Sequence, residues 1–282
     1  MFSKLSYTWT LMGASLEVLK RQKSLLIFPI LSFISCLIVM ASFLAPLILG
    51  HSTFTIPGKD APPADQVLFY AYWFMFYFCN YFVIIFFNSA IVACAALSFE
   101  GHEATAADGF KAAFSRLPQI VGWALLSATI GIVLRVIEDN SKQVGRLVTG
   151  LLGCAWTLVS FLAVPVLVLE KKGPIDALTT STSLLKKTWG EQLAGNFGFG
   201  MIFFLLTIPG LIGIVVSIIL GQGAPVILGL GLALSAMYLM MLSLVHSVLE
   251  MIFRTALYMY ARNGHAPAAF SEEMLGSALV RQ

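Results

Sequence analysis

The sequence predicts an all-α polytopic membrane protein, with six transmembrane helices in three hairpins and amphipathic helices along the cytoplasmic interface. Three observations predict this fold class. The 282 residues are 59% hydrophobic and 11% charged, whereas a soluble domain is roughly 45–50% apolar and about 25% charged. Six uncharged apolar runs are long enough to cross a hydrocarbon core of about 30 Å. Basic, amphipathic segments lie between pairs of these runs.

The six predicted spans cover residues 24–50, 75–99, 117–135, 147–169, 193–220 and 225–249. They are continuous and rich in Leu, Ile, Val and Phe, which is typical of helices and not of the alternating strands of a membrane β-barrel. Tyr, Trp and Phe crowd residues 67–82, so we expect the second helix to start in the membrane interface and cross later. Only "GQGAP" separates the last two spans, which predicts a tight hairpin. All six spans are expected to form a single domain, 1–282.

Four amphipathic segments are too polar to cross the membrane, and we expect them to lie along its interface. At 174–189 an apolar stripe recurs at helical spacing. Its members are Ile175, Leu178, Thr182, Leu185 and Trp189. A similar stripe occurs at 3–22, where "SLEVLKR" aligns with "STSLLKK", and weaker copies are predicted at 104–116 and 267–280. The chain therefore predicts three units, each an interfacial helix followed by a hairpin, closed by a fourth interfacial helix.

Basic residues flank these segments and are expected to contact anionic lipid head groups. They are Lys20, Arg21, Lys23, Lys171, Lys172, Lys186 and Lys187. With six spans both termini lie on one side, which holds all but four of the 17 lysines and arginines. The remaining four are Lys59, Arg135, Lys142 and Arg146. This positive-inside bias predicts cytoplasmic termini, and it explains the net charge of +3 without a nucleic-acid partner.

Two stretches resemble known membrane families. "GPIDALTTSTSLLKKTWGEQL" resembles a pattern of bacterial multi-pass families that include the membrane domain attached to some glycerophosphodiester phosphodiesterases. "SLEVLKRQKSLLIFPILSFI" is similar to the opening of an uncharacterised bacterial family of six-span proteins. The resemblance implies a helical protein of the bacterial inner membrane. It assigns no chemistry, because the phosphodiesterase activity belongs to a separate soluble domain that is not expected here.

A candidate site lies at the cytoplasmic end of the last span. His246, Glu250 and Arg254 are spaced by four residues and therefore share one helical face. One interpretation is a structural Glu250–Arg254 ion pair with His246 hydrogen-bonded beside it. The other is a proton-responsive or anion-sensing gate, because ionisable groups at membrane depth are costly and often functional, and histidine changes charge near neutral pH.

Two further features within the spans allow alternative interpretations. Asn80 and Asn88 are polar residues in an apolar run, and they either form interhelical hydrogen bonds or line a permeation path. Pro209 and Gly210 interrupt the fifth span. They predict either a hinge or, together with nearby glycines, close helix packing.

The sequence contains no Gly-Lys-Ser/Thr phosphate loop, CxxC pair, HExxH helix or GxSxG elbow. It therefore predicts no catalytic residue, no metal site and no cofactor. We expect a transporter or pore-forming protein for a small solute, ion or lipid. The alternative is a non-catalytic scaffold that organises lipids or partner proteins through its basic interfacial helices. Expected partners are anionic membrane lipids and further copies of the same chain.

Overall fold

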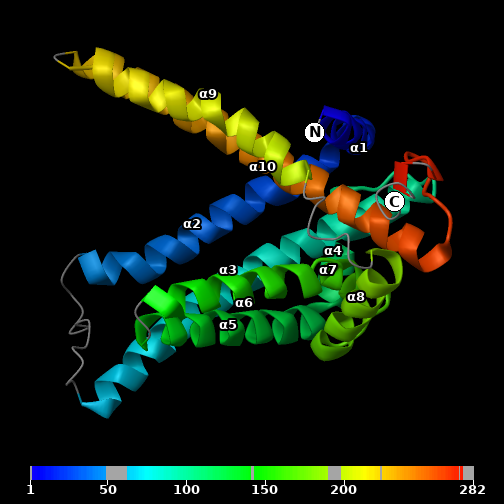
Figure 1. Cartoon of the computed structure of the whole chain (residues 1–282), viewed down its shortest axis with the longest axis horizontal. Coiled ribbons are helices and arrows are strands. Elements are labelled where there is room, and N and C mark those ends of the chain that lie inside the picture. The colour runs from blue at the N-terminus through cyan, green and yellow to red at the C-terminus, as the bar shows by residue number, and fades with distance from the viewer. Residues whose placement is uncertain are drawn as a thin grey trace. The chain divides into compact units, whose positions relative to one another are not determined.

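The computed structural model describes residues 2–48, 62–140, 143–189, 198–222, 224–272 and 274–275. Within these ranges every regular element is a helix (Figure 1). The elements are α1 (Phe2–Arg21), a 3-10 turn η1 (Lys23–Leu26), α2 (Ile27–Ile48), α3 (Pro63–Phe99), α4 (Ala106–Ser115), α5 (Leu117–Asn140), α6 (Gln143–Val159), α7 (Ala163–Leu169), α8 (Pro174–Trp189), α9 (Gly198–Leu220) and α10 (Pro225–Asn263).

Six helical stretches of the described residues are long and apolar enough to cross a membrane, which confirms the predicted fold class. They are Lys23–Ile48, Pro63–Phe99, Leu117–Glu138, Leu147–Leu169, Ile202–Leu220 and Pro225–Asn263. Each overlaps one predicted span. The grouping into three hairpins and the placement of amphipathic helices at a membrane surface stay predictions. Residues 49–50, 193–197, 273 and 276–280, which the predicted elements include, lie outside the described residues.

Two helices are longer than the spans predicted for them. α3 has 37 residues and begins at Pro63. α10 has 39 residues and continues past Leu249 to Asn263. At 1.5 Å per residue these helices are roughly 55 and 59 Å long, whereas the hydrocarbon core is about 30 Å thick. Each helix therefore extends well beyond the core of a bilayer.

The span predicted at 147–169 is interrupted. α6 ends at Val159 and α7 begins at Ala163. In the interruption, the backbone N–H of Leu162 donates to Ser181 Oγ of α8 at 3.1 Å, and both residues are buried. A backbone donor in apolar surroundings is costly unless it has an acceptor. Ser181 supplies that acceptor and so stabilises the break.

The contacts divide the chain into two compact units, whereas the sequence predicts a single domain. The first unit comprises Met1–Pro29, Ala95–Ala104 and Lys186–Gln282. The second unit comprises Ile30–Cys94 and Thr105–Leu185.

In the first unit, α9 and α10 are antiparallel neighbours that meet through small residues. A Cβ added at Gly213 of α9 would lie 2.6 Å from Ser235 Oγ of α10. A Cβ added at Gly231 of α10 would collide with Ser217 of α9. Small residues therefore allow the two backbones to approach closely, as is common between membrane helices.

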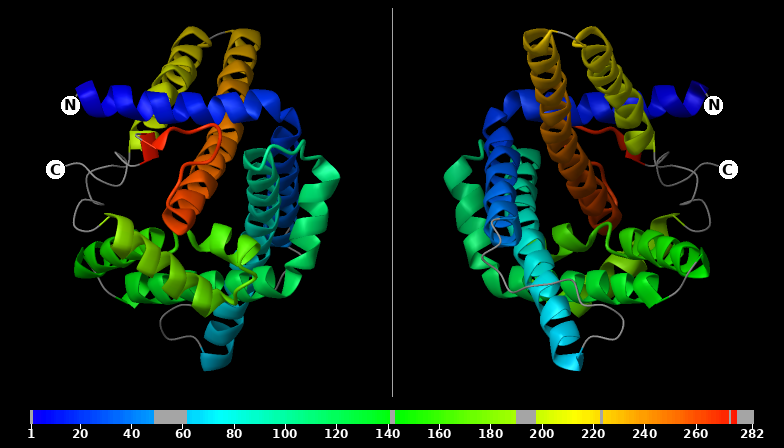
Figure 2. Two further views of the ribbon diagram at one scale, coloured as in Figure 1. Left: turned by 90° about the vertical axis from the view of Figure 1, so that its right-hand side faces the viewer. Right: turned by 90° about the vertical axis from the view of Figure 1, so that its left-hand side faces the viewer.

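Helix α1 crosses the α9–α10 pair in both views of Figure 2. The face of α1 that becomes buried includes Leu11, Val18 and Leu19. Burial of each large aliphatic side chain contributes about 1.5–3 kcal/mol relative to exposure in water. This apolar face therefore attaches α1 to the first unit.

In the second unit, three contacts show how the helices pack. Trp123 of α5 stacks on Trp156 of α6, with ring centroids 5.7 Å apart. A Cβ added at Gly122 would lie 2.8 Å from Cγ of Pro174, so the start of α8 lies close against α5. Phe43 of α2 contacts the aromatic residues of α3, with its centroid 5.2 Å from that of Tyr72.

The buried faces of α1 and α8 agree with the alignment of "SLEVLKR" and "STSLLKK". In α1 the buried residues include Leu11, Ser15, Val18 and Leu19, and in α8 they include Ala177, Ser181, Leu184 and Leu185. The two sets have the same spacing, and Ser15 and Ser181 are both 0% exposed. Trp9 of α1 and Ile175, a member of the apolar stripe predicted at 174–189, are exposed. Each helix therefore packs through one face and leaves the neighbouring apolar residues accessible.

The ends of three helices also repeat. Gly101, Lys171 and Gly264 follow α3, α7 and α10, and they have φ values of 84°, 59° and 79°. They lie near the start of "FEGHEATAADGF", "LEKKGPIDAL" and "ARNGHAPAAF", at the third, third and fourth residue. No other residue in the described ranges has a positive φ. Glycine adopts this conformation easily, whereas for a residue with a side chain, such as Lys171, the left-handed backbone conformation costs roughly 1–2 kcal/mol of free energy. This shared backbone geometry supports the internal repeat.

Helix α4 lies within the segment predicted at 104–116. Thr105 and Asp108 form a capping box at its N-terminus. Thr105 Oγ1 accepts from the backbone N–H of Asp108 at 3.3 Å. The Asp108 carboxylate accepts from the hydroxyl of Thr105 at 2.7 Å and from its backbone N–H at 3.0 Å. These hydrogen bonds, that from the hydroxyl most of all, hold the pKa of Asp108 below its ordinary value. The box supplies partners for backbone groups that a helix start leaves unpaired.

We expect the capping box to lose its stabilising effect in acid. Because the pKa of Asp108 is lower in the folded state, its contribution is present above the ordinary aspartate pKa of about 3.9 and disappears as the pH falls through the folded value. Asp108→Asn should therefore lower the thermal unfolding temperature in detergent at pH 6, and the difference from wild type should shrink as the pH falls below about 3.9. Glu103→Gln is the control, and a pH-independent difference for Asp108→Asn would contradict the role.

The last predicted interfacial segment, 267–280, is described only in part. A turn joins the backbone N–H of Phe270 to the carbonyl of Pro267 at 2.8 Å. Phe270 packs against Phe99, with ring centroids 6.0 Å apart. Leu275 is fully buried in the chain. This segment therefore packs into the first unit where the structure describes it.

Candidate functional site

The three residues predicted to share one face of α10 contact one another in sequence order. Arg254 Nη2 donates to Glu250 Oε1 at 2.6 Å. On the other side of the carboxylate, His246 Nε2 lies 3.9 Å from Glu250 Oε2. Glu250 therefore lies between a permanent cation and a group that is charged only when protonated.

A residue of α9 completes this cluster. Phe203 places its ring against His246, with centroids 4.1 Å apart and planes inclined by 34°. Phe203 is buried, while the side chains of His246, Glu250 and Arg254 are 33%, 32% and 21% exposed. The phenyl ring covers one side of the imidazole, so the cluster is half-buried and asymmetric.

The cluster lies on α10 between a stretch with large exposed apolar side chains and a stretch of buried core residues. Large exposed apolar side chains occur on α10 from Val226 to Met241. Buried core residues follow from Val248. His246, Glu250 and Arg254 all belong to the candidate span Pro225–Asn263, and they begin about one turn beyond the exposed apolar surface. They therefore lie near the end of the surface that can face hydrocarbon.

The two asparagines of α3 are half-buried in the second unit. Asn80 Nδ2 donates to the carbonyl of Phe76 in its own helix at 2.9 Å. The hydrogen bond of Asn80 in the structure therefore lies within α3 and does not join two helices. On a helical wheel Asn80 and Asn88 lie on the same side of α3 as Trp73, Tyr77 and Tyr81.

Pro209 and Gly210 lie where α9 packs tightly on α10. A Cβ added at Gly210 would lie 2.6 Å from Cδ2 of Leu239 and 2.9 Å from Cδ1 of Tyr238. The hydroxyl of Tyr238 donates to the carbonyl of Leu206 at 2.7 Å. Proline disturbs the carbonyls of the preceding turn, and Tyr238 supplies a donor there. The geometry favours close packing at this pair, and a hinge stays a prediction.

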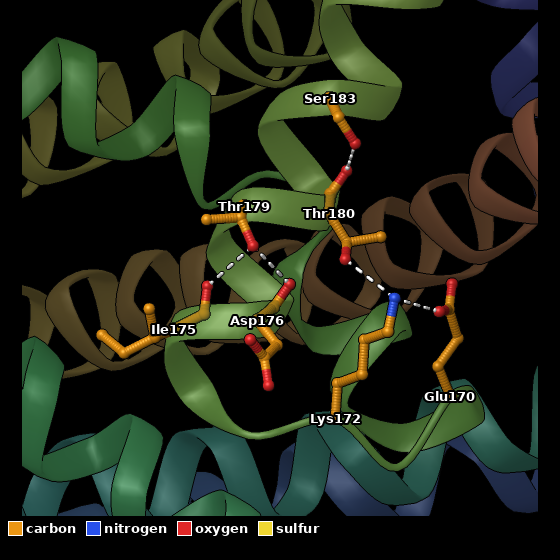
Figure 3. A network of polar contacts seen from close by, with 7 residues as sticks. All are labelled: Glu170, Lys172, Ile175, Asp176, Thr179, Thr180 and Ser183. Carbon is orange, nitrogen blue, oxygen red and sulfur yellow. Dashed lines mark hydrogen bonds and ion pairs between the residues drawn. The ribbon is translucent and has the colours of Figure 1, made fainter.

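Most of the predicted head-group residues are exposed. Those with exposed side chains are Lys20, Arg21, Lys23, Lys171 and Lys186, and the side chain of Lys187 lies outside the described residues. Arg21 pairs with Glu17 at 2.6 Å. Lys172 differs, because Figure 3 shows its ammonium between Glu170 at 2.7 Å and the hydroxyl of Thr180 at 3.0 Å. Lys172 thus links the end of α7 to α8.

Three of the contacts that the sequence did not predict lie at or near the candidate features. They are the Phe203–His246 contact, the Leu162–Ser181 hydrogen bond, and a cation–π contact in which Arg135 of α5 lies over Trp73 of α3 at 4.7 Å. Each joins residues that are distant in sequence. A helical periodicity shows which residues share a face of one helix and does not identify the partner helix.

Comparison with known families places the chain. Residues 67–268 match DUF6159, a family of unknown function. The chain belongs to this family. The DUF6159 match includes the cluster around Glu250, both asparagines and the Pro209–Gly210 pair, and it leaves out α1 and α2. Curated proteins and solved structures give no match to the chain. The resemblance to the membrane domain of glycerophosphodiester phosphodiesterases stays a prediction.

Proposed function

We propose that the protein is a multi-pass protein of the bacterial inner membrane that transports a small solute, ion or lipid. The observation that supports this proposal is the cluster of His246, Glu250 and Arg254 within a candidate membrane span. Ionisable residues are costly in such segments and commonly mark proton relays or ion paths. Glu250 lies between Arg254 and a histidine that becomes a second cation when it binds a proton.

In this proposal, the protonation state of His246 decides whether the Glu250 carboxylate pairs with Arg254 alone or also with His246. Neutral His246 leaves the carboxylate paired with Arg254 at 2.6 Å. Protonated His246, already 3.9 Å away, competes for the same carboxylate and weakens the hold on Arg254. The resulting movement of two side chains at the end of the span would open or close a path. The glycine-lined α9–α10 contact is the element that would respond.

The orientation rests on charge. Lysines and arginines concentrate on one side of the predicted topology, which favours cytoplasmic termini. We therefore propose that the Asn263 end of α10, with the cluster, lies toward the cytoplasm.

A scaffold for anionic lipids is the second candidate. Lys20 and Lys186 are exposed and follow the buried faces of α1 and α8 at equivalent positions of the repeat. Lysines placed in this way beside an interfacial helix attract anionic head groups by about 1 kcal/mol each. This role needs no path across the membrane and no catalytic residue.

The test is flux in liposomes that contain the purified full chain. We expect flux of a panel of ions and small solutes to depend on pH between about 5 and 8, where histidine titrates. Glu250→Gln should change the rate at every pH, because Arg254 loses its ion pair with the Glu250 carboxylate. His246→Gln should abolish the pH dependence in that range and leave a constant rate.

Glu17→Gln is a matched control. It removes a Glu–Arg pair of the same spacing and the same 2.6 Å distance, but on the exposed surface of α1. Its flux should equal that of wild type. If flux for wild type and all variants is indistinguishable from that of empty vesicles, the transport proposal is wrong and the scaffold remains.

A further inference from the structure

An aromatic face of α3 meets the end of α5 in the second unit. Trp73, Tyr77 and Tyr81 are spaced by four residues and form a ladder, with successive ring centroids 6.4 Å apart. Gly131 and Arg135 of α5 have the same spacing. A Cβ added at Gly131 would lie 3.8 Å from the Tyr81 ring, so α5 lies directly against the ladder.

Two of the contacts of Arg135 lie at one end of this ladder. Its guanidinium carbon lies 4.7 Å from the centroid of the Trp73 ring. Its Nη1 donates to the hydroxyl of Tyr77 at 3.4 Å. A cation–π contact attracts the guanidinium to the face of the indole ring. The planar group is therefore oriented by α3 before any ligand binds.

The polar groups gathered here are mainly hydrogen-bond donors. A guanidinium has five N–H groups and no acceptor, and an indole has one N–H and no acceptor. The hydroxyl of Tyr77 already accepts from Arg135 and has its own hydrogen to donate. The Nε1 of Trp73 is buried and has no acceptor among the residues that the structure describes. A buried donor without an acceptor is costly and calls for an explanation such as an ion.

The position of the cluster favours an oxyanion at head-group depth. Arg135 is three residues from the end of the candidate span Leu117–Glu138. Tryptophan and tyrosine are enriched at this level of a membrane. A guanidinium matches the planar pair of oxygens of a phosphate better than an ammonium does.

We propose that Arg135, Trp73 and Tyr77 form a binding site for a phosphate oxyanion, either in a lipid head group or as a free anion. Arg135 supplies the charge and paired N–H groups, the Nε1–H of Trp73 supplies a further donor, and Tyr77 orients Arg135. The site belongs entirely to the second unit. It does not depend on the proposed transport function, and its test does not measure flux.

The test follows the indole ¹⁵N–¹H resonances of the full chain in detergent micelles that lack phosphate. Trp73→Phe, which keeps an aromatic ring and removes the donor, identifies the Trp73 resonance by its loss. We expect phosphatidylglycerol to shift this resonance in wild type. Arg135→Gln should weaken binding by about tenfold or more, the usual effect of losing a charged hydrogen-bond partner. Arg135→Lys should be intermediate, because lysine keeps the charge without the planar fork.

Separate titrations distinguish the two sources of phosphate. A shift with phosphatidylglycerol and none with inorganic phosphate identifies a lipid site, and a shift with both identifies a site open to the free anion. Either result supports the site. Arg262→Gln, which changes an exposed arginine of the first unit, should bind like wild type.

Two results would overturn the proposal. One is an unshifted Trp73 resonance in both titrations. The other is equal lipid affinity in wild type, Arg135→Gln and Trp73→Phe, measured by native mass spectrometry of the bound phospholipid. Trp73→Phe keeps the test decisive if Arg135→Gln does not fold.

Discussion

Gly231→Ala is expected to destabilise the α9–α10 pair. The added methyl group would collide with Oγ and Cβ of Ser217, and overpacking of a close contact costs typically about 1–3 kcal/mol. This cost should outweigh the gain of up to about 1 kcal/mol in helix propensity from replacing glycine. The measurement is thermal unfolding of the full chain in detergent, followed by size-exclusion chromatography of the remaining folded protein.

Two variants make this test specific. Gly229→Ala is the control on the same helix, since a Cβ at Gly229 meets nothing within 4 Å, and it should be neutral or stabilising. The double variant Ser217→Gly with Gly231→Ala exchanges the two side chains across the contact and should recover much of the lost stability. If Gly231→Ala behaves like Gly229→Ala, the close approach described for these helices is wrong.

Ser181→Ala is expected to destabilise the interruption between α6 and α7. It leaves the buried N–H of Leu162 without its acceptor at 3.1 Å, and an unsatisfied buried donor costs about 1–3 kcal/mol. Amide hydrogen exchange at Leu162 should accelerate, and the thermal unfolding temperature in detergent should fall. The faster hydrogen exchange should be confined to the second unit.

Two other serines show whether the effect belongs to that hydrogen bond. Ser183→Ala removes a hydroxyl that is exposed and bonds the Thr180 carbonyl of its own helix. Ser15→Ala changes the residue that aligns with Ser181 in the repeat, but its hydroxyl donates to the Leu11 carbonyl of its own helix at 3.1 Å. Both should cost less than Ser181→Ala. Equal losses for all three would mean that Ser181 does not support the interruption.

Hydropathy alone predicted the fold class. It predicted the wrong helix end where a helix continues beyond its apolar run. Glu250 and Arg254 ended the predicted sixth span at residue 249, yet α10 continues to Asn263. The backbone hydrogen bonds of a helix do not require a continuous apolar surface. Glu250 and Arg254 pair with each other at 2.6 Å. The pair allows both charged residues to lie within α10, although hydropathy places the end of the span before them.

The interruption at 160–162 shows the opposite case, because here the helix breaks inside a continuous apolar run. "SFLAV" is uniformly suited to a span, and Pro165, which follows it, predicts a kink near this point but not the break at 160–162 itself. The stabilising group, Ser181, lies 19 residues later in another helix. Local patterns do not contain such tertiary hydrogen bonds.

The candidate site was predictable only in part. Spacing by four placed His246, Glu250 and Arg254 on one face, and their distances agree with that arrangement. Phe203 and the Arg135–Trp73 contact each come from a second helix, so they required the packing of the chain. The apolar stripes showed that α1 and α8 are amphipathic. They did not reveal that Ser15 and Ser181 lie on the buried faces, because close contacts between helices favour small residues over large ones.

The exposed apolar surface of the α9–α10 pair has a consequence for the lipid around it. Its large exposed side chains occur at residues 204–220 on α9 and at 226–241 on α10, which corresponds to roughly 24 and 23 Å along the helix axes. A hydrocarbon core of about 30 Å is thicker than this surface. Because hydrophobic mismatch costs a fraction of a kcal/mol per ångström, we expect the bilayer to thin beside these helices. The pair would then favour regions with shorter acyl chains, and lipid thickness becomes a variable that can change its tilt.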